Sequence, residues 1–256
     1  KPMSQDSISA GFEYQLARST SLTVNYVHNN LVRTIEDLGD LVDGDEVYKY
    51  VNPGEGIATL ANVSTATERF RVPKAKRQYD ALQVSVNRRF ADSWFMGGSY
   101  VLSRLYGNYS GIQNSDEIRT PTLGFVFSTD QQSAGSTFRF GGNANRSWDL
   151  DEMMWDANGN VDPQGRLATD RPHQFKLYGS YLAPFGTQVG WDFYAASGTP
   201  LTTFLLTLNR TEVFVNGRGD MGRTPVLSQT DLLLSHEVRI PGAANNRLRF
   251  ELNVLN

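Results

Sequence analysis

Alternation of apolar and polar residues with a period of two is the feature that most constrains this chain. It occurs in eight segments that come in pairs, and a short turn separates the members of each pair. In the first pair, Ile8 to Leu16 and Leu22 to Tyr26 carry apolar side chains at every second position. A period of two places the apolar side chains of a strand on one face. The pattern predicts eight antiparallel strands in four hairpins.

The apolar parity continues across each short turn, which predicts how the strands pair. Centring the third hairpin on Pro184 places Leu177 opposite Trp191 on the apolar side. The same register places Lys176 opposite Asp192 on the other side, an opposite-charge pair of the kind that stabilises a sheet. Parity and turn length leave a shift of two residues open.

The connections alternate between short and long. Those inside hairpins have about four to seven residues, whereas those between hairpins span about 30–77, 105–173 and 196–228. Unstructured loops above about 12–15 residues are uncommon in compact domains. Three long loops that alternate with tight turns are typical of a transmembrane β-barrel with short periplasmic turns and long extracellular loops. A soluble sandwich would also alternate, but it gives no reason for all long loops to lie at one end.

Composition supports the same fold class. The longest unbroken apolar run has four residues, far fewer than the roughly 20 that a helical membrane span requires. Aromatic residues on the apolar parity suit the girdles of a membrane barrel. We therefore expect an all-β transmembrane antiparallel barrel wall in the Gram-negative outer membrane, with lipid against the apolar face. The opposite parity is too polar for a dry core and is expected to face a water-filled lumen; it includes Glu13, Gln83, Lys176, Asp192, Glu237 and Arg249.

Several function classes are disfavoured by residue content. The chain has no cysteine, which excludes disulfide scaffolds, thiolate metal sites and cysteine nucleophiles. Its net charge of −3 gives no general attraction to nucleic acid. The three histidines, His28, His173 and His236, show no paired spacing for zinc or catalysis. No nucleophile elbow, P-loop or dinucleotide fingerprint occurs, so we expect no enzyme.

One stretch of the second long loop has spacing suited to a hard cation. Asp156, Asn158, Asn160 and Asp162 offer side-chain oxygens at alternate positions, which would let them converge on Ca²⁺. The stretch fits the EF-hand pattern poorly. The competing interpretation is that Asn158 and Gly159 form a tight turn in a loop hairpin. No other cofactor is expected.

The long loops also carry the candidate ligand-binding residues. Charge is segregated, with an acidic run over 36–55 and a basic run over 69–77. These runs either form a solvated surface or fold over the barrel mouth, where they engage a ligand or each other. Loop residues with aromatic or cationic side chains that we regard as candidates for ligand contact are Tyr109, Arg146, Trp148 and Trp155.

Several phrases resemble the late barrel of TonB-dependent outer-membrane transporters, in particular the Oar-like branch. The phrases are Tyr79-Asp-Ala-Leu-Gln-Val-Ser-Val-Asn-Arg-Arg89, Ala168-Thr-Asp-Arg-Pro-His-Gln-Phe-Lys176, Ala183-Pro-Phe-Gly186, Ser197-Gly-Thr-Pro200, Arg223-Thr-Pro225, Gln229-Thr-Asp231 and Phe250-Glu-Leu-Asn-Val-Leu-Asn256. The resemblance spans about residues 4 to 256 and is densest from 168 onward. It implies a 22-stranded barrel with an N-terminal plug and a TonB box, which imports nutrients through coupling to the TonB complex.

Nothing in the chain resembles a plug or a TonB box, and the eight expected strands would be only part of such a wall. We therefore expect residues 1–256 to be a C-terminal portion of the barrel that binds and imports a bulky nutrient. The rest of the barrel, the plug and the TonB complex would be its partners. Eight strands can also close into a small barrel. A self-contained outer-membrane adhesin or recognition protein therefore remains the alternative, and a secreted soluble β-domain such as a lectin is a third interpretation.

Overall fold

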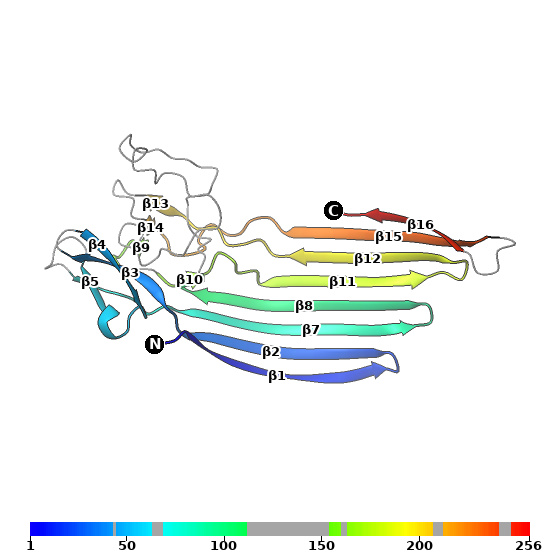
Figure 1. Ribbon diagram of the computed structural model, residues 1–256, viewed down its shortest axis with the longest axis horizontal. Coiled ribbons are helices and arrows are strands. Elements are labelled where there is room, and N and C mark those ends of the chain that lie inside the picture. The colour runs from blue at the N-terminus through cyan, green and yellow to red at the C-terminus, as the bar shows by residue number, and fades with distance from the viewer. Residues whose placement is uncertain (43–44, 63–68, 112–153, 160–162, 207–211, 241–246) are drawn as a thin grey trace.

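A computed structural model describes residues 1–42, 45–62, 69–111, 154–159, 163–206, 212–240 and 247–256. Its main element is one antiparallel sheet in which eight strands follow each other in chain order (Figure 1). A short ninth strand, β10 (Gly165–Arg166), pairs with β8. The prediction of eight antiparallel strands is confirmed. In order across the sheet they are β1 (Ser4–Ala17), β2 (Thr20–Arg33), β7 (Arg77–Ala91), β8 (Trp94–Gly107), β11 (His173–Leu182), β12 (Thr187–Ala196), β15 (Leu227–Arg239) and β16 (Arg247–Val254).

The pairing places most apolar residues of the sheet on one face and most polar residues on the other, because directly paired residues of neighbouring strands share a face. We call these the apolar face and the polar face. One row of paired residues on the apolar face is Tyr14, Leu22, Val86, Gly98, Leu177 and Phe193. The adjacent row on the polar face is Glu13, Thr23, Ser85, Ser99, Lys176, Tyr194 and Gln229.

The register of the third hairpin differs from the expected one by two residues. Leu177 pairs with Phe193 rather than Trp191, and Lys176 pairs with Tyr194 rather than Asp192. The turn causes this shift: the Gly186 N–H donates to the carbonyl of Ala183 at 3.0 Å, and Gly186 has a φ of +87° that suits glycine. The turn is therefore centred one residue later than Pro184. A shift of two preserves parity, so both faces keep their residues.

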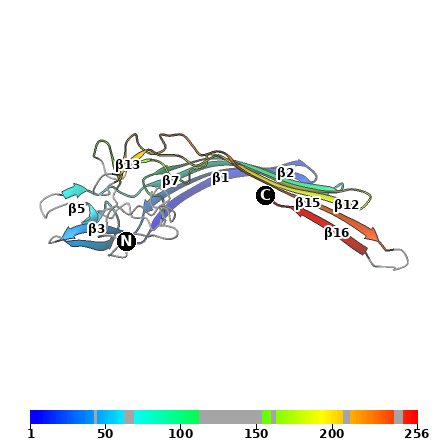
Figure 2. The ribbon, with the colours of Figure 1, turned by 90° about the horizontal axis from the view of Figure 1, so that it is seen from above.

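All long connecting segments gather at one end of the sheet, opposite the short turns (Figures 1 and 2). We call these segments, residues 34–76, 108–172 and 197–226 as far as they are described, the rim. A parallel pairing of β14 with β9 joins the second segment to the third. The rim contains β3 (Glu36–Val42), β4 (Asp45–Val51), the 3-10 turn η1 (Gly56–Ala58), β5 (Leu60–Asn62), β6 (Arg69–Arg71), β9 (Met154–Asp156), β13 (Phe204–Leu206) and β14 (Glu212–Phe214).

Most buried apolar residues lie in the rim or where the sheet meets it. One cluster of these consists of Leu31, Leu38, Val51, Ala58, Val72, Ala75 and Tyr109. In contrast, many side chains of the apolar face are exposed; Phe12, for example, is 60% exposed. A contiguous exposed apolar face of this size in a folded protein marks a surface that contacts another apolar phase. Within the described ranges, no helix combines the length and the apolar content needed to cross a membrane.

Candidate functional site

The base of the rim is held by a buried ion pair, which we call the Asp170–Arg223 clamp. Asp170 has a side chain only 2% exposed, and its Oδ2 lies 2.5 Å from Nη2 of Arg223. The Oδ1 atom of Asp170 accepts the backbone N–H of Leu105 at 2.7 Å. Nη1 of Arg223 donates to the backbone carbonyls of Asp170 and Gly198 at 2.7 and 3.0 Å. The clamp thus connects β8, the segment before β11 and both ends of the third connecting segment.

A second set of contacts continues the clamp toward β11 and β12. Arg171 donates to the carbonyl of Ser197 at 2.6 Å, and the Ser197 Oγ accepts the N–H of His173 at 3.2 Å. Beside them, a Cβ on Gly198 would lie 1.6 Å from the carbonyl oxygen of Thr224, so only glycine fits there. Three of the phrases that carry the family resemblance, at 168–176, 197–200 and 223–225, therefore meet in space.

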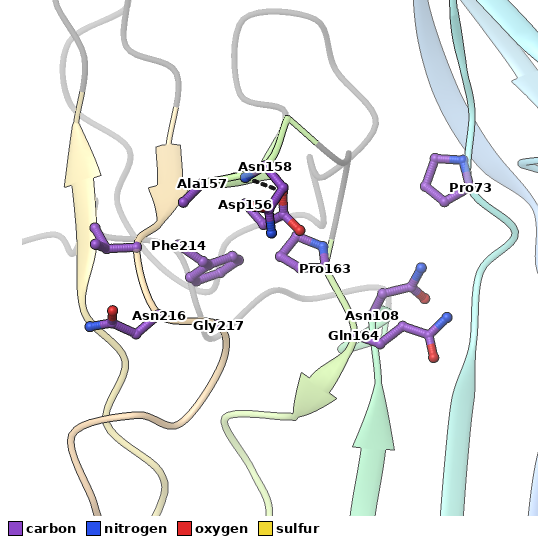
Figure 3. Close-up of a pocket in the computed structure, with 11 residues that line it drawn as sticks. Pro73, Asn108, Asp156, Ala157, Asn158, Pro163, Gln164, Phe214, Asn216 and Gly217 are labelled. Carbon is purple, nitrogen blue, oxygen red and sulfur yellow. Dashed lines mark hydrogen bonds between the residues drawn. The ribbon is translucent and has the colours of Figure 1, made fainter.

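A cavity of about 570 Å³ opens in the rim (Figure 3). All three connecting segments contribute to it, which makes it the convergent feature of the rim. Its polar groups are mainly side-chain amides, with one carboxylate, and proline rings supply part of the apolar wall. The lining residues are Pro73, Asn108, Asp156, Ala157, Asn158, Pro163, Gln164, Phe214, Val215, Asn216 and Gly217.

The wall of this cavity is fixed from behind by Arg218. Its guanidinium lies 4.6 Å from the ring centre of Phe214, and its Nε donates to the carbonyl of Pro163 at 2.7 Å. Phe214 is only 1% exposed, so its ring supports the wall and offers no open face to a ligand. The amides of Asn158, Gln164 and Asn216 are exposed and remain accessible.

The proposed calcium ligands fall partly in this cavity. Asp156 and Asn158 both line it, whereas Asn160 and Asp162 lie outside the described residues. The Oδ1 of Asp156 accepts the N–H of Asn158 at 2.8 Å, and Gly159, with a φ of +79°, donates its N–H to the carbonyl of Asp156 at 3.0 Å. This is the tight turn that the competing interpretation expects. Calcium binding stays a prediction, because only half of the ligand set is described.

The four candidate ligand-contact residues have different positions. Arg146 and Trp148 lie outside the described residues. Trp155 is half-buried in β9. Tyr109 is 1% exposed, its hydroxyl accepts a hydrogen bond from Thr34 Oγ1 at 3.2 Å, and burial raises its pKa to about 12. Tyr109 therefore belongs to the rim core, although its edge reaches a second cavity.

This second cavity, of about 640 Å³, lies on the polar face where β2, β7 and β8 enter the rim. Its lining combines one cation, Arg77, with the phenol of Tyr79 and the amides of Gln5 and Asn29. Arg77 also donates to the carbonyl of Ser110 at 3.2 Å, which fixes its side chain at the cavity wall.

The segregated loop charges partly engage each other. Glu55, from the acidic run, lies 2.9 Å from Nζ of Lys74 in the basic run and 2.9 Å from Nε of Arg33. Hydrogen bonds from Lys74 and Arg33 lower the pKa of Glu55 to about 2. The interpretation that opposite-sign loops engage each other is thus realised at Glu55.

The six residues expected to face a lumen all lie on the polar face. Glu13 and Lys176 share the polar row given above, and Gln83 pairs with Val101 one row away. Asp192 pairs with Tyr178 and with Asp231, and Glu237 pairs with Arg249.

The histidines make ordinary strand contacts. His28 Nδ1 lies 2.7 Å from Asp80, His173 Nδ1 lies 2.7 Å from the hydroxyl of Tyr100, and His236 Nδ1 lies 2.8 Å from Thr187. In the part of the chain that the structure describes, no three His, Asp or Glu side chains are grouped to hold a metal ion. Sequence reasoning missed the Asp170–Arg223 clamp and both cavities, because each is assembled from segments that are far apart in the chain.

Comparison with known proteins identifies the barrel. Residues 1–151 match the outer membrane β-barrel domain family. Over 262 aligned residues the chain is 29% identical to the TonB-dependent transporter Oar of Myxococcus xanthus, an alignment that covers 100% of this chain and 21% of that protein. The fold is similar to the crystal structure of the outer membrane transporter YddB from Escherichia coli, with a TM-score of 0.52 at 11% identity over 98% of this chain and 28% of that one. The chain thus spans about a fifth of the length of the first protein and just over a quarter of the second, both of them transporters. It belongs to the outer membrane β-barrel domain family and forms part of a transporter-type barrel in the outer membrane.

Proposed function

We propose that this chain is part of the wall and rim of a TonB-dependent receptor that binds a bulky nutrient at the rim and imports it. The observation that carries the proposal is the rim itself. Its three segments, as far as they are described, meet at a single end of the sheet and line cavities there, among them those of about 570 and 640 Å³. Similarity to a TonB-dependent transporter extends over the whole chain, which supports the same function. The plug and the TonB complex would act on parts of the protein outside these residues.

The two faces of the sheet support an orientation in the membrane. The apolar face would contact lipid, and the polar face, with Glu13, Gln83, Lys176, Asp192, Glu237 and Arg249, would line a water-filled lumen. The rim would lie outside the cell and the short turns in the periplasm. The second cavity opens on the polar face, so a ligand released from the rim would reach the lumen side directly.

The accessible amides of the first cavity are the proposed ligand contacts. Asn158, Gln164 and Asn216 each offer donors and an acceptor, and no lysine or arginine lines that cavity among the described residues. Arg77 provides a cation in the second cavity. The self-contained adhesin has less support, because β1 and β16 lie at the two edges of the described sheet and do not pair with each other.

Transport can be tested without a known ligand. Cells with and without the protein, each with and without TonB, are grown in a complex nutrient medium, and mass spectrometry measures which compounds are depleted. The proposal expects at least one compound whose depletion requires both the protein and TonB. If no compound shows this double requirement, the transport function is refuted.

Orientation can be tested separately by labelling introduced cysteines, since the chain has none of its own. Asn158→Cys places a thiol on the exposed rim, and Phe185→Cys places a matched thiol at a short turn, where the side chain is 72% exposed. A membrane-impermeant maleimide on intact cells should label the first variant and spare the second. The opposite labelling pattern would overturn the orientation.

A further inference from the structure

The apolar face ends abruptly on the side of the rim. In three adjacent strands, β2, β7 and β8, the last apolar or aromatic row is followed by a row of ionisable residues at one level. This second row, which we call the boundary row, consists of His28, Asp80 and Arg104, which pair directly with each other in that order. The row below it consists of Tyr26, Leu82 and Leu102.

The height of the apolar band matches a membrane. On β8 it extends from Trp94 to Leu102, which at about 3.3 Å per residue is roughly 26 Å of strand. A strand tilt of about 40° reduces this to about 20 Å, close to the roughly 25 Å band of outer-membrane barrels. The opposite edge of the apolar band, at the short-turn end of the sheet, is marked by Arg88, whose guanidinium lies 4.0 Å from the Trp94 ring. The boundary row therefore lies at the level of the lipid headgroups on the rim side.

Two arginines flank one tyrosine at this level on the apolar face. Arg104 lies in the boundary row, and its guanidinium is 4.4 Å from the ring centre of Tyr106, two residues further along β8. Arg166 of β10 pairs directly with Tyr106 and so shares its face. Arg104 and Arg166 are diagonal neighbours, about 7–8 Å apart at the backbone. Both side chains are exposed, and neither guanidinium makes a hydrogen bond to the part of the chain that the structure describes.

The acids nearest to this pair are already engaged. Asp80 pairs with Arg104 across the strands, but its Oδ1 receives the Tyr26 hydroxyl at 2.9 Å and lies 2.7 Å from His28 Nδ1. Asp170 is buried in its clamp with Arg223. The Asp80 carboxylate keeps its charge when it accepts the Tyr26 hydroxyl, so it offsets one of the two arginine charges. The surface around Tyr106 therefore keeps an excess of one positive charge.

We propose that Arg104, Tyr106 and Arg166 bind the phosphate of a glycolipid in the outer leaflet of the outer membrane. Guanidinium groups match phosphate oxygens with paired, charge-assisted hydrogen bonds, and the phenol adds a third donor. The acyl chains of such a lipid would lie directly below, on Leu102 and Tyr100 of the apolar band. Free phosphate would gain only the polar contacts, so the arrangement favours the lipid. This inference depends on the membrane position of the barrel and not on the transported ligand.

The test measures lipid retention by the protein purified from outer membranes in mild detergent. Native mass spectrometry counts bound lipid A that carries both phosphates, and a parallel sample uses lipid A from which the phosphates have been removed. The variants are Arg104→Gln with Arg166→Gln, and Arg239→Gln as the matched control, an exposed arginine on the polar face at the short-turn end. A folding check, the heat-dependent mobility of the barrel on gels, accompanies each variant.

We expect the double variant to retain about a hundredfold less of the phosphorylated lipid, because each of the two lost charge-assisted hydrogen bonds is worth about tenfold in affinity. The control should retain it as the parent protein does. Equal retention of the dephosphorylated lipid by the parent protein would overturn the proposal, as would a double variant that folds and loses nothing. Displacement of the lipid by millimolar inorganic phosphate would show a free-phosphate site and would also overturn it.

Discussion

Replacing Leu177 with arginine tests the assignment of the apolar face to lipid. Leu177 lies on β11 four residues from His173 and four from Tyr181, which occupy the two edges of the apolar band. At about 3.3 Å per residue, each edge is roughly 13 Å away along the strand, so Leu177 lies near the bilayer midplane. An arginine facing lipid at that depth costs about 2–4 kcal/mol, and this cost falls to about 0–1 kcal/mol near the interface. Leu177→Arg should therefore lower the free energy of unfolding by about 2–4 kcal/mol.

The assay is reversible urea unfolding of the barrel in lipid vesicles, followed by tryptophan fluorescence. Ser85→Arg is the matched control. Ser85 is the neighbour of Val86, which belongs to the same apolar row as Leu177, so it lies at a similar depth. Its side chain, however, is on the polar face, where Ser85 pairs with Thr23 and Ser99. Ile8→Arg is the depth control, since Ile8 pairs with His28 of the boundary row. The reasoning is refuted if Ser85→Arg destabilises the barrel more than Leu177→Arg, or if all three variants behave alike.

Three further predictions concern the rim and the packing of the sheet. Asp170→Ala should cost about 3–5 kcal/mol locally, because it leaves the Arg223 guanidinium without its buried partner; limited proteolysis should then cut the rim faster while the sheet resists. Gly97→Val should cost about 0.5–1.5 kcal/mol, because a Cβ there would lie 2.3 Å from Cζ of Tyr178 and would push this exposed side chain off its rotamer; the penalty should shrink when Tyr178→Ala is added, and a double-mutant cycle measures this. The contacts of Glu55 with Arg33 and Lys74 should hold until the pH falls through about 2, because its folded-state pKa is lowered to about 2 from 4.5. Their contribution to folding stability should be complete above about pH 4.5 and decline as the pH falls toward 2. Carboxyl titration by NMR checks the last prediction, and weakening near neutral pH would contradict it.

The faces of the sheet were predictable from the sequence because side-chain direction depends only on parity. A residue such as Leu177 stays on the apolar face in any register that shifts by two, so an error in the turn leaves its environment unchanged. The register itself was not predictable, since it depends on which residue of the Ala183–Gly186 turn adopts the left-handed conformation. Parity fixes the face of a residue, and the turn backbone fixes its partner.

The rim was predictable only as three long segments. Its core residue Tyr109 lies in a stretch without periodicity, so nothing local distinguished a buried tyrosine from a ligand-contacting one. Asp170 likewise reads as one more acid in a charged loop, and only the arrival of Arg223 from a distant segment makes it a buried ion pair. Contacts of this kind depend on tertiary proximity, which alternation and composition do not encode.

The chemistry of the clamp explains why three of the short phrases that resemble transporters meet there. Most partners of the clamp are backbone atoms: the N–H of Leu105 and the carbonyls of Gly198 and Asp170. Such contacts require an aspartate, an arginine and a glycine at these positions, but they place no requirement on the neighbouring side chains. The first cavity, in contrast, is lined by side chains such as Asn158 and Gln164 that the clamp does not constrain. A rim built this way can change its ligand-contacting residues while its attachment to the barrel stays the same, which is what a receptor architecture requires if it is to serve many ligands.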